Sequence, residues 1–129
     1  MPQQSVSIAI RITDHLSGEI NQDVRVLGTY DPESDCLRYT EPEPMAQVTL
    51  TLRENAVTLV RRSEWTTVLE FAQEGSFRVD SDQGTLSGRL DLITYVRSES
   101  SVTLEYRLFG PQGELAHTTY TLNFKGHLS

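Results

Sequence analysis

Eight polar side chains occupy sequence positions that otherwise carry apolar residues. Each shares the parity of the apolar residues in its own stretch of alternating sequence: Tyr30, Tyr39, Glu41, Arg61, Thr67, Thr94, Tyr106 and Tyr120. Buried hydroxyl, carboxylate and guanidinium groups need hydrogen-bond partners, so we expect these side chains to form a network inside the protein. Six of them are our candidates for lining a ligand site: Tyr30, Tyr39, Glu41, Arg61, Thr94 and Tyr106.

The pair Glu41 and Arg61 supports two interpretations. In the functional one, the guanidinium group of Arg61 (or of Arg62) binds an anionic or carbonyl-bearing small molecule that tyrosines orient. In the structural one, Arg61 and Glu41 form an internal ion pair, braced by tyrosine hydroxyls, that closes one end of the fold. Interior ion pairs are commonly structural, which gives the second interpretation somewhat more weight.

Catalytic and metal-binding patterns are missing from the sequence. Cys36 has no histidine close in sequence, and there is no G-x-S-x-G elbow or glycine-rich phosphate loop. His15, His117 and His127 are scattered singly, so we expect solvated histidines and no metal site. Residues 80–84 lack the acidic ligands of a calcium loop. The sequence therefore predicts a non-enzymatic protein without a cofactor.

Composition narrows the class of protein further. A chain of 129 residues with 37% hydrophobic and 22% charged residues is typical of one folded domain. The net charge of −7 argues against a nucleic-acid partner, because binding to phosphates relies on clustered Lys and Arg. With Cys36 as its single cysteine, the chain forms no internal disulfide. No secretory signal and no apolar run of about 20 residues is present, so we expect a cytoplasmic protein without a membrane partner.

The clearest alternation, over residues 84–109, predicts a long β-hairpin. Its first half places on one parity Leu86, Gly88, Leu90, Leu92, Thr94 and Val96. After a polar turn, its second half places on the buried side Val102, Leu104, Tyr106 and Leu108. Strands with one wet face and one buried face produce this pattern. Gly88 stands at an inward position, where the long strand is expected to bend.

Similar alternation elsewhere predicts about nine or ten strands and no amphipathic helix. Besides the hairpin, the predicted strands are 5–13, 22–30, 36–41, 47–53, 56–62, 65–71, a short strand at Phe77 and Val79, and 114–124. Such spacing is typical of antiparallel sandwiches and barrels. A single closed or nearly closed up-and-down meander is the simplest architecture, because closure removes exposed sheet edges. We therefore expect one β-barrel domain over residues 1–129.

Several motifs resemble those of a known family. Gly28-Thr29-Tyr30, followed by the LRYTE sequence of residues 37–41, is similar to the G-x-Y … L-x-Y-x-E opening of the YwiB-like family, a bacterial domain of unknown function. Later features agree in order and spacing: Leu69-Glu70-Phe71 before Gly75, Leu90-x-Leu92-x-Thr94 after a glycine, and Leu104-Glu105-Tyr106. The resemblance covers nearly the whole chain. It implies an antiparallel calycin-like (lipocalin-like) barrel of about 8–10 strands, a cytoplasmic setting and no assigned activity.

Two functional hypotheses follow. The first is that the barrel binds a small, anionic or carbonyl-bearing ligand in a partly polar lumen without catalysis. The second is an interaction or structural module whose barrel is filled by side chains. Its outer surface, or an open edge near residues 42–45, would bind a protein partner or a second copy of the chain. Its contact surface would use apolar residues of outward parity: Val60, Val68, Ile93, Tyr95 and Phe109. An enzyme ranks third.

Overall fold

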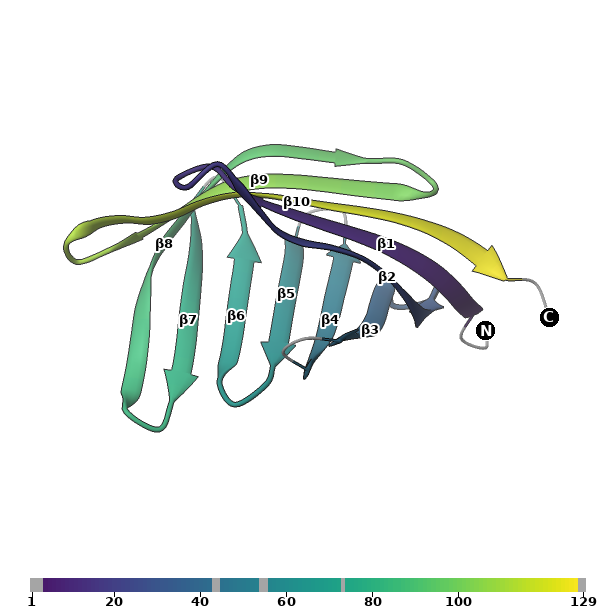
Figure 1. The fold of residues 1–129 in the computed structure, drawn as a ribbon, viewed down its shortest axis with the longest axis horizontal. Helices are drawn as coiled ribbons and strands as arrows, with labels where there is room; N and C mark the ends of the chain where they lie inside the picture. Colours follow the sequence, from purple (N-terminus) through teal and green to yellow (C-terminus); the bar gives the residue numbers. More distant parts are fainter. Residues whose placement is uncertain (1–3, 43–44, 54–55, 73, 128–129) are drawn as a thin grey trace.

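Ten stretches of alternating sequence form ten antiparallel strands in the computed structural model of the chain (Figure 1). The structure describes residues 4–42, 45–53, 56–72 and 74–127. The strands are β1 (Gln4–Asp14), β2 (Glu19–Asp31), β3 (Cys36–Pro42), β4 (Met45–Arg53), β5 (Ala56–Arg62), β6 (Thr66–Phe71), β7 (Gly75–Ser81), β8 (Gly84–Arg97), β9 (Ser101–Gly110) and β10 (Gly113–His127). No helix in this part of the chain is long and apolar enough to span a membrane.

Each strand pairs with the next along the chain, and β1 pairs with β10 to close the barrel. The predicted closed antiparallel meander is therefore confirmed. Figure 1 shows β3–β7 side by side in one wall, with β9, β10 and β1 in the wall across from it. The long strands β2 and β8 pass from one wall to the other. The interior between the walls is where any ligand site of the barrel must lie.

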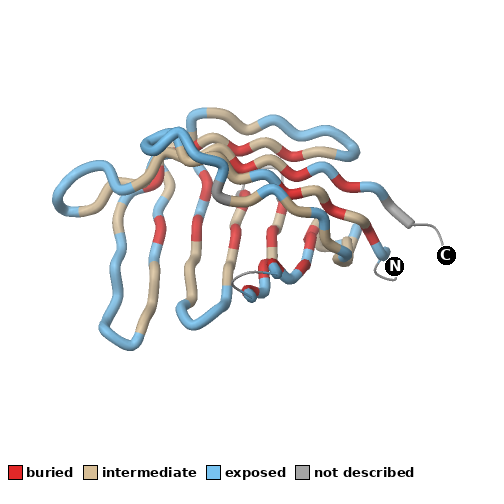
Figure 2. The backbone as a smooth tube through the Cα atoms, in the orientation of Figure 1, coloured by how far each residue is buried: buried red, intermediate tan, exposed pale blue. Residues whose placement is uncertain are grey.

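Alternating apolar side chains fill most of that interior. Figure 2 shows buried residues at every second position along many of the strands. The fully buried set comes from both walls and includes Ile8, Ile10, Leu50, Leu90, Leu104 and Leu122. Burial of such side chains, at about 25 cal/mol for each Å² of apolar surface removed from water, is the main source of stability for this fold.

The predicted parity of the long hairpin is wrong beyond Leu92. A β-bulge between Leu92 and Thr94 shifts the register, so that Thr94 pairs with the outward Glu105 and Tyr95 with the buried Leu104. One extra residue in a strand turns every later side chain to the opposite face. Thr94 therefore leaves the lumen, and Tyr95 packs against the core.

Other differences concern strand ends. The strand β2 begins at Glu19, three residues before the predicted start, because a tight turn with Gly18 at φ 77° replaces the expected longer loop. Trp65, the first residue of the predicted strand 65–71, precedes β6 and is 55% exposed. The hairpin turn predicted at Glu54-Asn55 lies outside the described residues.

Two glycines on the inward parity of their strands allow close backbone approach. A Cβ atom on Gly28 would lie 2.5 Å from the carbonyl oxygen of Arg38 and 2.8 Å from Cδ1 of Ile8. On Gly88 it would overlap the carbonyl oxygen of Phe109 and lie 2.8 Å from Cε1 of Phe77. Both positions exclude any larger side chain unless the neighbouring backbone moves.

Candidate functional site

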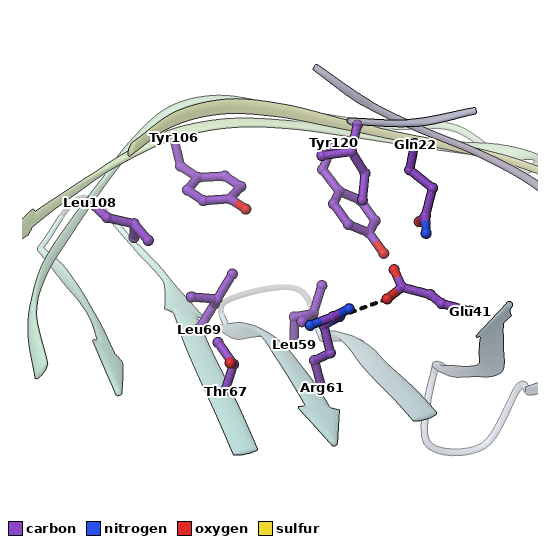
Figure 3. A pocket seen from close by; sticks show the side chains of 10 residues that line it. Gln22, Glu41, Leu59, Arg61, Thr67, Leu69, Tyr106, Leu108 and Tyr120 are labelled. Carbon is purple, nitrogen blue, oxygen red and sulfur yellow. Dashed lines mark hydrogen bonds and ion pairs between the residues drawn. The ribbon is translucent and has the colours of Figure 1, made fainter. Parts of the chain in front are cut away.

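A cavity of about 370 Å³ occupies one end of the barrel interior (Figure 3). Side chains from seven strands in both walls line it: Ile12, Gln22, Glu41, Leu59, Arg61, Thr67, Leu69, Tyr106, Leu108 and Tyr120. Figure 3 shows the polar groups of Gln22, Glu41, Arg61 and Tyr120 converging on one side, with Leu69 and Leu108 on the other. The cavity thus combines an apolar wall with a polar cluster.

The Glu41–Arg61 ion pair forms the polar floor of this cavity. Nε of Arg61 donates to Oε1 of Glu41 at 2.6 Å, and Glu41 is only 1% exposed. Neighbouring strands bring the two together: Arg61 on β5 pairs with Val48 on β4, and Val48 pairs with Tyr39, two residues before Glu41. Among the described residues, only Glu41 accepts a hydrogen bond from Arg61. The two terminal nitrogens of the guanidinium group are therefore available to a ligand.

Tyrosine hydroxyls border the ion pair as neutral groups. The hydroxyls of Tyr39 and Tyr120 are hydrogen-bonded to each other, and both side chains are buried. Burial raises the pKa of Tyr120. Burial also raises the pKa of Tyr106 to about 12; the nearby Glu41 adds to the rise, and a hydrogen bond with Thr118 opposes it. Both phenols keep their protons at neutral pH, so they act as hydrogen-bonding groups rather than as general bases.

Gln22 contributes a buried acceptor without a partner. Its Oε1 atom is inaccessible to solvent and accepts no hydrogen bond from any described residue. Leaving a buried polar atom unpaired costs about 1–3 kcal/mol. The sequence analysis missed Gln22, although it begins the predicted strand 22–30 with the parity of Val24 and Val26. A glutamine at an inward position was the available signal.

The structure brings together three of the six candidate ligand residues. Glu41, Arg61 and Tyr106 line the cavity, while Tyr39 touches it only through its hydrogen bond to Tyr120. Tyr30 belongs to a different cluster at the other end of the barrel, and Thr94 points outward after the β8 bulge. Two further residues of inward parity line the cavity and were outside our six candidates: Thr67 and Tyr120.

A hydrogen-bonded network around Asp35 and Arg97 lies at the opposite end of the barrel. Both terminal nitrogens of Arg97 donate to the Asp35 carboxylate, and one also donates to the carbonyl of Leu52 at 2.9 Å. The hydroxyl of Tyr30 donates to Oδ1 of Asp35 at 2.6 Å. Burial alone would raise the pKa of Asp35, but the bonds from Arg97 and Tyr30 outweigh it and lower the pKa. Asp35 and Arg97 thus satisfy each other, which favours a structural role for this pair.

Replacing Asp35 with asparagine is expected to lower the free energy of unfolding by about 2 kcal/mol near neutral pH, because the charge-assisted bonds from Arg97 are lost. Asparagine tolerates the positive φ of 54° at this position, so the variant isolates the charge. Because the pKa of Asp35 is lowered in the folded state, its contribution is complete above an ordinary value of 3.8 and is lost as the pH falls through the folded pKa. Urea denaturation at several pH values should show the difference between wild type and variant shrinking in acid. A difference that stays constant down to pH 3 or so would contradict this assignment.

Comparison with solved structures gives a match along nearly the whole chain. The crystal structure of the ywiB protein from Bacillus subtilis matches with a TM-score of 0.70 and 11% sequence identity, over 98% of this chain and 94% of that chain. No protein-family model matches the sequence, and a search of curated proteins finds no match. At this identity the match shows the fold alone. The resemblance to YwiB-like barrels predicted from the sequence is thereby confirmed at the level of the fold.

Proposed function

We propose that this protein is a non-enzymatic binding protein that holds a small molecule in the cavity at the Glu41–Arg61 end of the barrel. The observation that carries the proposal is the unpaired Oε1 of Gln22, buried at the wall of a cavity of about 370 Å³. Cavities of this size are typical of small-molecule sites. Gln22 lines the cavity, so its amide can turn toward a ligand that donates a hydrogen bond, which removes the cost of the unpaired acceptor.

The side chains of the cavity define the chemistry of the ligand. The terminal nitrogens of Arg61 suit a carboxylate or carbonyl group, since a guanidinium group donates through a planar fork. Gln22 suits a hydroxyl or amide N–H group of the same ligand. Leu59, Leu69 and Leu108 provide an apolar wall. We therefore expect a small amphipathic carboxylic acid or amide whose polar head meets Arg61 and Gln22.

Binding rather than catalysis fits the protonation states of the site. The tyrosines that face the cavity have raised pKa values and stay neutral, and Arg61 is held by Glu41. A general base needs a pKa near the working pH, and burial moves the pKa values of Tyr106 and Tyr120 away from it. We also place the protein in the cytoplasm, where reducing conditions preserve a free thiol such as the buried Cys36.

Gln22→Leu tests the proposal. Without ligand, the variant should be as stable as wild type or more stable by about 1 kcal/mol, because an unpaired buried acceptor is replaced by an apolar group of similar size. Its affinity for a ligand that donates to Gln22 should fall by about tenfold, the effect of one lost hydrogen bond. A thermal-shift screen of short-chain hydroxy acids and acyl amides, with native mass spectrometry of the purified protein, would measure both quantities.

The neighbouring arginines give the matched control. Arg62→Gln changes an exposed residue on the outward face, beside Arg61 in sequence, and should leave the affinity unchanged. Arg61→Gln should abolish the ligand-induced thermal shift. A protein that binds none of the screened molecules and yields no co-purified ligand would overturn the proposal, as would equal effects of the two arginine variants.

The interaction module is the second hypothesis, and the structure alters its contact surface. Of the five apolar residues expected on the outer surface, Tyr95 instead packs against the core. Phe109 is covered by the guanidinium group of Arg89, which lies 4.4 Å from its ring centroid. Ile93 is 48% exposed and remains. No observation on the outer wall favours this hypothesis over ligand binding.

A further inference from the structure

Two histidines and a glutamate far apart in the sequence meet on the outer surface of the barrel, across β1, β10 and β9. His15 follows β1 directly, and its backbone N–H donates to the carbonyl of His117 at 2.8 Å, which extends the β1–β10 ladder past the pair Asp14 and Thr118. The two imidazole rings lie 4.4 Å apart between centroids. Nε2 of His117 lies 2.7 Å from Oε2 of Glu105 on β9. Barrel closure thus creates a cluster that spacing along the chain does not show.

The donor atoms of this cluster are close enough to share one ion. One ligand atom from each of His15, Glu105 and His117 lies within 4.8 Å of the others. Tetrahedral zinc with bonds of about 2.0–2.2 Å holds its ligand atoms roughly 3.4 Å apart. His15 is exposed, so small rotamer changes can bring the donors to that separation.

Neighbouring groups favour this role. Nε2 of His15 lies 2.6 Å from Oγ1 of Thr119, which fixes the ring and leaves Nδ1 to a metal. Metal-binding histidines usually have their second nitrogen held in this way. Arg107 lies opposite His117 in the β9–β10 ladder, but it is paired with Glu114 at 3.4 Å. Its positive charge is thereby offset, which leaves the carboxylate of Glu105 to balance a dication.

We propose that His15, Glu105 and His117 form a binding site for a divalent first-row transition metal, with Zn²⁺ as the expected occupant. Two imidazoles and one carboxylate suit Zn²⁺, whereas Ca²⁺ and Mg²⁺ prefer oxygen ligands throughout. The site is independent of the cavity: its residues point outward from the same strands whose Tyr106 and Tyr120 point inward. A metal here joins the first strand of the barrel to the last two, so it should also stabilise the closed fold.

Isothermal titration of Zn²⁺ into the full chain, prepared without a histidine tag, tests the proposal. We expect about one Zn²⁺ per chain, a visible absorption band on Co²⁺ substitution and a Zn²⁺-dependent rise in Tm. His15→Gln and His117→Gln should each weaken binding by roughly tenfold or more, and Glu105→Gln should weaken it as well. Because all three side chains lie on the outer surface, circular dichroism should show that these variants remain folded.

His127→Gln is the matched control, because it makes the same substitution in the third histidine of the chain. Residue 127 lies ten positions beyond His117 on β10, roughly 33 Å away along the strand. The control should bind Zn²⁺ as wild type does. Absence of saturable Zn²⁺ binding would overturn the proposal, and so would a loss of affinity in His127→Gln equal to that in His117→Gln.

Discussion

Replacing Arg61 with methionine is expected to lower the free energy of unfolding by about 3 kcal/mol, because the carboxylate of Glu41 then stays buried without its partner. Removing one member of a buried ion pair typically costs about 3–5 kcal/mol. The Glu41 side chain is 2% exposed and that of Arg61 is 34% exposed. Because the Arg61 side chain is partly exposed, water can partly solvate the Glu41 carboxylate once the guanidinium group is gone. The expected cost is therefore at the lower end of that range. Urea denaturation of the ligand-free protein would measure it.

The double variant Glu41→Gln, Arg61→Met separates the charge from the packing. A neutral amide is far cheaper to bury than a carboxylate, so adding Glu41→Gln should restore more than half of the stability lost in Arg61→Met. If the stability losses of Glu41→Gln and Arg61→Met simply add up to the loss of the double variant, Glu41 and Arg61 do not interact energetically. This pair then could not be the structural base of the cavity.

Replacing Gly88 with alanine, which adds a single methyl group, is expected to lower the free energy of unfolding by about 3 kcal/mol. The added Cβ would overlap the carbonyl oxygen of Phe109, and a backbone atom of a paired strand cannot turn away as a side chain can. Overpacking of this kind costs about 1–3 kcal/mol, and contact with backbone favours the upper end. Thermal and urea denaturation would measure the loss.

Ser87→Ala is the matched control for Gly88→Ala. Ser87 precedes Gly88 on β8 and is exposed, so its loss should change the stability by less than about 0.5 kcal/mol. A cost for Gly88→Ala no larger than that for Ser87→Ala would mean that β8 and β9 separate easily at this point, contrary to the close approach of Gly88 to the backbone of Phe109.

The sequence predicts the barrel well because alternation is a local signal that closure of the sheet does not disturb. The buried faces of β1, β3, β4 and β5 follow the predicted alternation. The alternation pattern does not predict the bulge in β8. Thr94 and Tyr95 are both compatible with either face, and the register shift becomes visible only from the pairing with β9.

The candidate site was predictable only in part, for a related reason. Parity identified the inward polar residues but not which end of the barrel each occupies, so Tyr30 was grouped with Glu41 and Arg61. The strand register decides this: Tyr30 pairs with Leu37, whereas Glu41 lies at the other end of β3. The cluster of His15 and His117 depends on the pairing of strands from opposite ends of the sequence.

The pairing of β1 with β10 has a consequence for how the chain acquires its fold during synthesis. While the ribosome makes the chain, β1 can pair with β2 early, but its other edge waits until β10 has emerged, roughly 100 residues later. An uncovered strand edge rich in isoleucine is a site of association with other chains. Contacts of such long range also slow folding, to milliseconds or seconds for barrels of this kind. β10 is the last strand of the barrel to be translated, so its pairing with β1 completes the fold and covers the exposed edge of β1.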